Sequence, residues 1–141
     1  MKISVDTNII VGFWLGTPEG QRDIQSVRQM QGRGDTFLVC GVVYTELCAA
    51  PGHSRASVEA FLKVAGVGLD YAMPAPVWEA AADANAVHQG QRRRNRQGTL
   101  KRVVPDFLIG AHALHRADAL LTLNPGDFAD FPGLALLVPR P

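Results

Sequence analysis

The hydrophobic and polar positions of this 141-residue chain form short apolar runs separated by longer amphipathic stretches. The short runs are rich in the β-branched and aromatic residues that strands prefer. The longer stretches repeat apolar residues three or four positions apart, which is typical of helices. The predicted strands span residues 2–5, 36–40, 67–72, 119–123 and 134–138. The predicted helices span residues 8–15, 18–31, 42–50, 54–65, 74–88 and 105–116.

Residues that cap or begin helices support these boundaries. Ser54 is a favourable N-cap, and Pro74 and Pro105 stand where helices are expected to begin. Strands that alternate with helices indicate βαβ units and a parallel sheet covered on both faces. We therefore predict one α/β domain over residues 1–141, with a central parallel sheet of four to five strands flanked by helices. The aromatic residues of the helices, among them Trp14 and Trp78, are expected in the core.

The overall composition is that of an ordinary globular domain. Hydrophobic residues make up 47% of the chain and charged residues 19%, with a net charge of +1. No apolar run reaches the length needed to span a bilayer, and no signal-peptide pattern precedes the first strand. Cys40 and Cys48 are too few for a disulfide scaffold or a zinc cluster. These features predict a cytoplasmic protein without a membrane partner.

The basic residues are unevenly distributed. No acidic residue lies between Asp83 and Asp106, and this gap holds six of the 14 basic residues. They are Arg92, Arg93, Arg94, Arg96, Lys101 and Arg102. Two interpretations of this segment stay open: a solvated loop, or a surface that contacts phosphates.

Four acidic residues lie where strands end or helices begin. Asp6 directly follows the first strand and Asp127 follows the fourth, so both are expected at the edge where open parallel sheets bind ligands. Glu46 lies in the helix over 42–50, and Asp106 begins the helix over 105–116. Each has an ordinary explanation as well: a helix cap, a favourable charge at a helix start, a turn residue, or a carboxylate that reaches water.

The joint placement of these acids is more informative than any one of them. Three or four convergent carboxylates repel one another strongly unless a cation lies between them. Oxygen ligands without Cys or His favour a hard divalent ion such as Mg²⁺ or Mn²⁺. Such an ion polarises a phosphoryl oxygen and activates water. Together with the neighbouring basic segment, the acidic set indicates hydrolysis of phosphodiester bonds.

Four segments carry a resemblance to a known family: "ISVDTNIIV", "VVYTELCAA", "VVPDFLIGAHAL" and "LLTLNPGDFADFPGL". Taken together they resemble PIN-domain endoribonucleases, in particular the VapC toxins of bacterial toxin–antitoxin pairs. The resemblance implies that Asp6, Glu46, Asp106 and Asp127 are catalytic and bind metal. It assigns supporting roles to Thr7, Asn8, Thr122 and Asn124. The family often has Arg where this chain has Leu123, and either Asn124 or Asp127 is the fourth site residue.

The resemblance also implies partners. It predicts a Mg²⁺- or Mn²⁺-dependent endoribonuclease that hydrolyses tRNA, rRNA or mRNA. If the basic segment contacts phosphates, those phosphates would belong to this RNA. The resemblance further predicts a homodimer that a cognate VapB-type antitoxin holds inactive. The alternative is a catalytically silent PIN-like module that binds only RNA or a protein. A haloacid-dehalogenase-like phosphotransferase also begins with a strand that ends in Asp, but position 8 is Asn and no suitable Lys follows Lys101.

Overall fold

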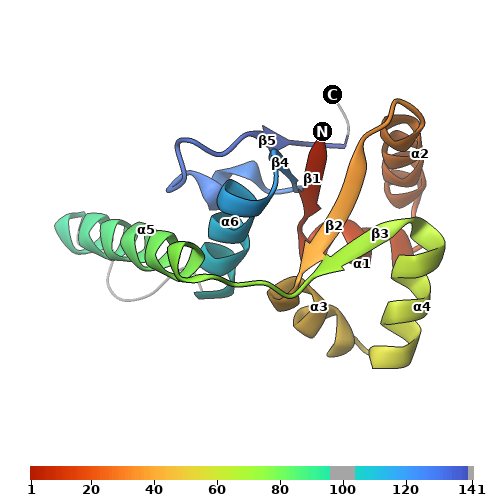
Figure 1. The fold of residues 1–141 in the computed structure, drawn as a ribbon, viewed down its shortest axis with the longest axis horizontal. Coiled ribbons are helices and arrows are strands. Elements are labelled where there is room, and N and C mark those ends of the chain that lie inside the picture. Colours follow the sequence, from red (N-terminus) through yellow and green to blue (C-terminus); the bar gives the residue numbers. More distant parts are fainter. Residues whose placement is uncertain (96–103, 140–141) are drawn as a thin grey trace.

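A computed structural model describes residues 1–95 and 104–139 of the chain. Its centre is a five-stranded sheet with the strand order β3-β2-β1-β4-β5 (Figure 1). All neighbouring strands pair in parallel. The strands are β1 (Lys2–Val5), β2 (Thr36–Cys40), β3 (Val67–Asp70), β4 (Ala119–Leu121) and β5 (Leu136–Leu137). The predicted α/β class and parallel sheet are confirmed, although β3, β4 and β5 are shorter than expected.

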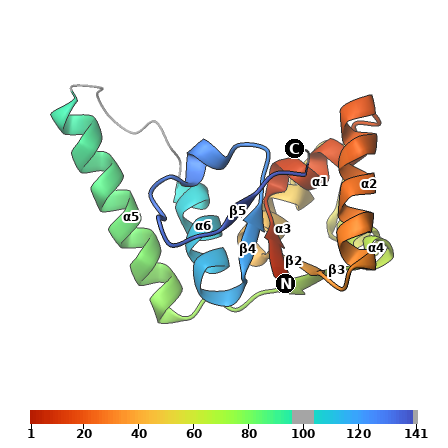
Figure 2. The ribbon, with the colours of Figure 1, turned by 90° about the horizontal axis from the view of Figure 1, so that it is seen from above.

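Helices follow the strands in the predicted order. They are α1 (Thr7–Trp14), α2 (Pro18–Gly32), α3 (Gly41–Cys48), α4 (Arg55–Ala65), α5 (Ala75–Arg94) and α6 (Val104–Arg116), with a short 3₁₀ helix η1 (Pro125–Phe128). Figures 1 and 2 place α5 at one end of the molecule beside α6, and α2 at the other end. In the ranges 1–95 and 104–139, no helix combines the length and the apolar character that crossing a membrane requires.

Strand β1 is the centre of the sheet and of the core. Ile3 pairs with Phe37 of β2 on one side and with Ala119 of β4 on the other. The chain moves outward from β1 through β2 to β3 and then returns to the opposite side with β4, so the strand order reverses between β1 and β4. Such a reversal leaves a crevice at the carboxyl ends of the two strands. Asp6 lies there, and its backbone N–H donates to the carbonyl of Leu121 at 3.0 Å.

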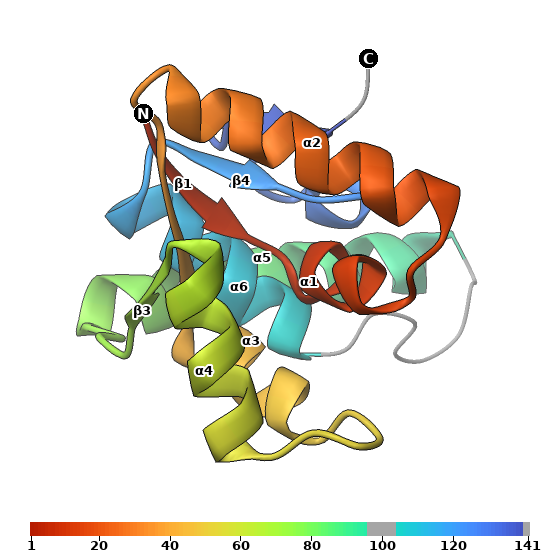
Figure 3. The ribbon, with the colours of Figure 1, turned by 90° about the vertical axis from the view of Figure 1, so that its right-hand side faces the viewer.

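Helices α1 and α2 approach each other closely because α2 carries a glycine, Gly20, at the contact. A Cβ atom at Gly20 would collide with the backbone carbonyl of Gly12. Thr17 caps α2 by accepting a hydrogen bond from the backbone N–H of Gly20 at 3.1 Å. In Figure 3, α1, α2 and α4 lie on the side of the molecule that faces the viewer. The close crossing fixes α1, and with it the residues that follow Asp6.

The basic segment differs from the prediction. Helix α5 does not end near residue 88 but continues to Arg94, so Arg92, Arg93 and Arg94 belong to its last turn and not to a loop. Arginine is a good helix former, and positive charge at a helix C-terminus interacts favourably with the helix dipole. The other three predicted RNA-binding residues, Arg96, Lys101 and Arg102, lie outside the described residues.

Trp78 was expected in the core, and this expectation is wrong. Its side chain is 52% exposed. The buried side chains of α5 are Val77, Ala81 and Ala84, which recur four and three residues apart and form a narrow stripe. Trp78 lies just outside this stripe, and its indole N–H donates to the carbonyl of Met73 at 2.9 Å.

Candidate active site

An open cavity of about 360 Å³ lies at the carboxyl edge of the sheet, between the ends of β1 and β4 and the starts of α1 and α6. Its lining residues are Asp6, Thr7, Asn8, Val11, Glu46, Asp106, Asn124 and Asp127. The structure thus places all four predicted acids around one cavity, together with three of the four predicted supporting residues. The fourth, Thr122, is fully buried and bonds directly to Asp6.

Asp6 both caps α1 and faces the cavity. One carboxylate oxygen accepts the backbone N–H of Thr7 at 2.8 Å, and the other accepts the Thr122 hydroxyl at 2.7 Å. Burial raises the pKa of Asp6 above its usual value. The two hydrogen bonds oppose this rise, and the negative charges of Glu46 and Asp127 add to it. The cap and the site therefore use the same carboxylate.

Two further contacts join the segments around Asp6. The hydroxyl of Thr7 donates to the carboxylate of Glu46 at 2.6 Å, which links the start of α1 to α3. The side-chain oxygen of Asn8 accepts the backbone N–H of Leu123 at 3.3 Å. Thr7 and Asn8 thus connect the start of α1 to α3, which carries Glu46, and to the segment after β4, which leads to Asp127.

The segment after β4 is held by Thr122. Its hydroxyl oxygen accepts the backbone N–H of Asn124 at 3.1 Å while the hydroxyl donates to Asp6. Asn124 precedes η1, whose residue Asp127 lines the cavity from the same side. Asp106, in the first turn of α6, also lines the cavity. The cavity is consequently built from four separate segments of the chain.

The donor set of the cavity suits a hard divalent cation. Carboxylate, amide and hydroxyl oxygens line it, without sulfur or imidazole. Among the described residues, no three acidic, histidine or cysteine side chains are gathered closely enough to hold a metal ion as they stand. Glu46 is exposed, and it bonds to Thr7. The charges of Glu46 and Asp127 act unfavourably on ionised Asp6, and a cation between them would offset that repulsion.

The sequence matches the PIN domain family over residues 3–134, which is most of the chain. The chain belongs to the PIN domain family. No curated protein matches it in sequence. All residues that line the acidic cavity lie within the matched range.

Solved structures share the fold of this PIN domain at low sequence identity. VapBC-1 from nontypeable Haemophilus influenzae aligns with a TM-score of 0.71 at 18% identity, over 100% of both chains. VapBC2 from Rickettsia felis, bound to a DNA fragment from its promoter, gives 0.67 at 17% identity over 98% of both chains. A toxin–antitoxin complex from Klebsiella pneumoniae gives 0.58 at 21% identity, also over 98% of both. At these identities the similarity shows the fold.

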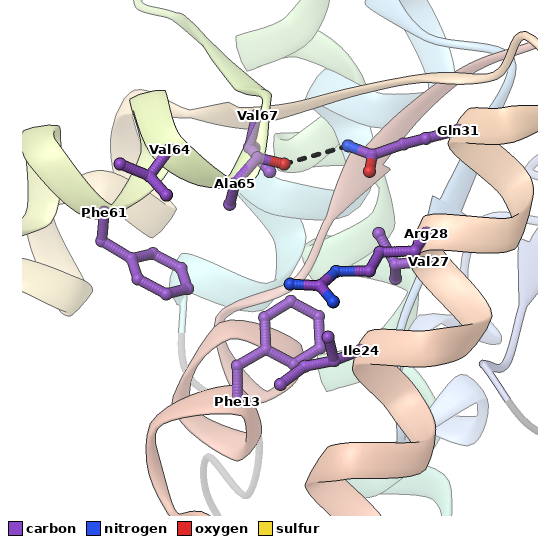
Figure 4. A pocket seen from close by; sticks show the side chains of 9 residues that line it. All are labelled: Phe13, Ile24, Val27, Arg28, Gln31, Phe61, Val64, Ala65 and Val67. Carbon is purple, nitrogen blue, oxygen red and sulfur yellow. Dashed lines mark hydrogen bonds between the residues drawn. The ribbon is translucent and has the colours of Figure 1, made fainter.

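A second cavity of the PIN domain, of about 200 Å³, lies between α1, α2 and α4 (Figure 4). We call it the apolar groove. Its lining residues are Phe13, Ile24, Val27, Arg28, Gln31, Phe61, Val64, Ala65 and Val67. Gln31 donates to the carbonyl of Ala65 at 3.0 Å and thereby links α2 to the end of α4. Helix α1 connects the two cavities, since Val11 lines the acidic one and Phe13 lines the groove.

A partly buried polar cluster that the sequence did not reveal fixes α6 against β3. The Arg116 guanidinium donates to the carboxylate of Asp70 at 2.6 Å, and the ring of His112 lies 3.1 Å from the same oxygen. The hydrogen bond from Arg116 lowers the pKa of Asp70 to about 2, and burial lowers the pKa of His112. Because α6 also carries Asp106, this cluster helps to fix the helix that supplies one acid of the cavity.

Proposed function

We propose that this PIN domain is a metal-dependent endoribonuclease, the VapC-type toxin of a type II toxin–antitoxin system, and that it acts in the cytoplasm. One observation carries the proposal: Asp6, Glu46, Asp106 and Asp127 line a single cavity at the point where the strand order reverses. An oxygen-only acidic site of this kind suits the hydrolysis of phosphodiester bonds.

The proposed metal ligands are these four carboxylates, for Mg²⁺ or Mn²⁺. When bound, the ion would supply an activated water and neutralise charge on the phosphate. The chain's own contribution is to hold the ligands in place. Thr122 and the backbone of Thr7 fix both oxygens of Asp6, and the Thr7 hydroxyl restrains Glu46. Asn124 and Asp127 both line the cavity, and we assign the fourth ligand to Asp127 because it offers a carboxylate, whose charge raises the pKa of Asp6.

The proposed substrate is RNA, in the form of tRNA, rRNA or mRNA. The last turn of α5 supports this choice, since it presents Arg93 and Arg94 to solvent. Arginine side chains contact phosphates without reading the base sequence. We extend the proposed contact surface to Arg92 and, by sequence position, to Arg96, Lys101 and Arg102.

The proposed protein partners are a VapB-type antitoxin and a second copy of the chain. Similar folds occur in proteins described as VapBC and toxin–antitoxin complexes. We place an apolar side chain of the antitoxin in the apolar groove, where Val64 is 89% exposed. Arg28 points into this groove and has no hydrogen-bond or ion-pair partner among the described residues (Figure 4), so an acidic residue of the antitoxin would complement it. A partner seated there would lie beside α1, which also borders the acidic cavity.

The nuclease proposal is tested with purified protein, free of any partner, on total RNA with Mg²⁺ or Mn²⁺. We expect cleavage by the wild type that stops on chelation and in the Asp6→Asn and Glu46→Gln variants. Glu19→Gln is the matched control, because Glu19 is an exposed acid on α2 outside the cavity. Cleavage that persists in Asp6→Asn, or that needs no divalent ion, would refute the mechanism. Metal-independent RNA binding without cleavage by the wild type would favour the silent module.

A further inference from the structure

An exposed aromatic side chain stands just after β3, at the edge of the sheet that also holds the acidic cavity. Tyr71 is 60% exposed although it belongs to a short connection between β3 and α5. Its ring meets that of Tyr44 nearly at right angles, with the centroids 5.7 Å apart. The ring also lies against Gly41, where an added Cβ would be 3.7 Å away. Tyr71 is therefore held in place from one side while much of it stays in contact with water.

The guanidinium of Arg55 lies next to Tyr44, the residue that supports the ring of Tyr71. The Nε–H of Arg55 donates to the hydroxyl of Tyr44 at 3.2 Å. This bond uses one of the five N–H donors of the guanidinium and leaves the terminal nitrogens available for an anion. Arg55 is exposed, and the charge of Glu59 and, more weakly, the side chain of Tyr71 also act on it electrostatically. We call Tyr71, Tyr44 and Arg55 the aromatic shelf.

The aromatic shelf and the acidic cavity lie on opposite sides of one short helix. In the parallel register Cys40 pairs with Asp70, so α3 begins at the same level of the sheet as Tyr71, the residue that follows β3. Tyr44 and Glu46 both belong to α3: the first supports Tyr71 and the second lines the cavity. Helix α3 thus contributes to both the acidic cavity and the aromatic shelf.

We propose that the aromatic shelf binds one unpaired nucleotide of the RNA substrate, with its base stacked on Tyr71 and its phosphate on Arg55. This inference rests on the proposed RNA substrate and deepens it, because a base can stack on a side chain only where it is not paired in a duplex. Every base has a flat aromatic face, so the shelf selects unpaired RNA without selecting its sequence.

The experiment measures the affinity of a fluorescent single-stranded RNA in the Asp6→Asn background, where hydrolysis does not interfere. Base stacking contributes about 1–3 kcal/mol by alanine substitution, so Tyr71→Ala should weaken binding about 5- to 150-fold. Tyr71→Phe should keep the affinity. Tyr71→Leu, of similar size but without an aromatic face, should lose it. Arg55→Ala should lower the slope of log affinity against log salt by about 0.7, the value for one phosphate contact on a single strand.

Two controls separate this inference from its rivals. The same RNA annealed to its complement should bind equally well to the Tyr71 variants and to the background protein. The oligomeric state, measured by light scattering, should not change. Equal single-strand affinity in Tyr71→Ala would overturn the aromatic shelf while leaving the nuclease proposal intact. Loss of self-association in Tyr71→Ala but not in Tyr71→Leu would assign the patch to a second copy of the chain and overturn the shelf. If no variant binds RNA and the wild type cleaves none, the proposed function fails, and the shelf fails with it.

Discussion

Thr122 offers a direct way to perturb the carboxylate at the centre of the cavity. Its hydroxyl donates to Asp6 at 2.7 Å, and both side chains are largely shielded from water: Thr122 is 0% and Asp6 7% exposed. Substitution by valine keeps the shape and removes the donor. The buried methyl group of valine cannot replace the lost bond, so one oxygen of Asp6 loses its protein partner.

The size of the effect follows from the charge of Asp6. A hydrogen bond to an ionised group contributes about 1.5–3 kcal/mol, whereas one between neutral groups contributes about 0.5–1.5 kcal/mol. The bond to Asn124 adds little, because Asn124 is exposed and its N–H can bond to water instead. Thr122→Val should therefore lower the free energy of unfolding by about 1.5–3 kcal/mol where Asp6 is ionised. It should also raise the pKa of Asp6 further, since the Thr122 hydrogen bond now holds it down.

Urea unfolding of the metal-free protein at several pH values measures both effects. The loss should be largest at neutral pH and should shrink as the pH falls through the pKa of Asp6, where the carboxyl becomes neutral. A cycle that combines Thr122→Val with Asp6→Asn isolates the pairwise energy. A destabilisation that is the same at pH 4 and pH 8, or that is unchanged by Asp6→Asn, would show that the hydroxyl acts through packing and not through the carboxylate.

Three further predictions concern other effects of charged side chains. Burial raises the pKa of Asp6, so ionisation of this carboxyl destabilises the folded state as the pH rises through that pKa. Asp6→Asn should therefore raise the free energy of unfolding in EDTA at pH 7 but not near pH 3. A lower free energy of unfolding at pH 7 would contradict this prediction. Asp70, with its pKa held at about 2, should contribute stability that is present above pH 4 and is lost as the pH falls towards 2; Arg116→Ala should remove this acid-range dependence in thermal unfolding. Replacing Arg93 and Arg94 by alanine should weaken RNA binding and lower the slope of log affinity against log salt concentration by up to about 1.4. An unchanged slope would show that neither residue contacts a phosphate.

The fold was predictable because its signals are local. Buried strands such as Lys2–Val5 and Thr36–Cys40 are apolar runs, and the helices between them begin at recognisable caps such as Ser54. The strand order is not a local property, and the pattern alone did not give β3-β2-β1-β4-β5. The end of α5 was misjudged because a run of arginines reads equally well as a solvated loop and as the last turn of a helix.

The candidate site was accessible to sequence reasoning in part. Asp6, Glu46, Asp106 and Asp127 lie on separate segments, and motif resemblance grouped them before the structure placed them around one cavity. The contact between Asp70 and Arg116 could not be predicted from the sequence, because the two residues are 46 positions apart and each alone is an ordinary surface charge. Trp78 shows the same limit: its exposure depends on which side of α5 faces α6, and an alanine-rich helix gives a weak signal for that choice.

The central claim is that the four carboxylates hold a divalent ion that drives RNA hydrolysis. The most direct test is the initial rate of cleavage of an end-labelled RNA by the wild type and by Asp106→Asn at matched protein concentration, over a range of Mn²⁺ concentrations. The account predicts a wild-type rate that saturates with Mn²⁺ and vanishes in EDTA, and an Asp106→Asn rate that stays at background at every concentration. Equal rates for the two proteins, or a wild-type rate independent of Mn²⁺, would contradict it.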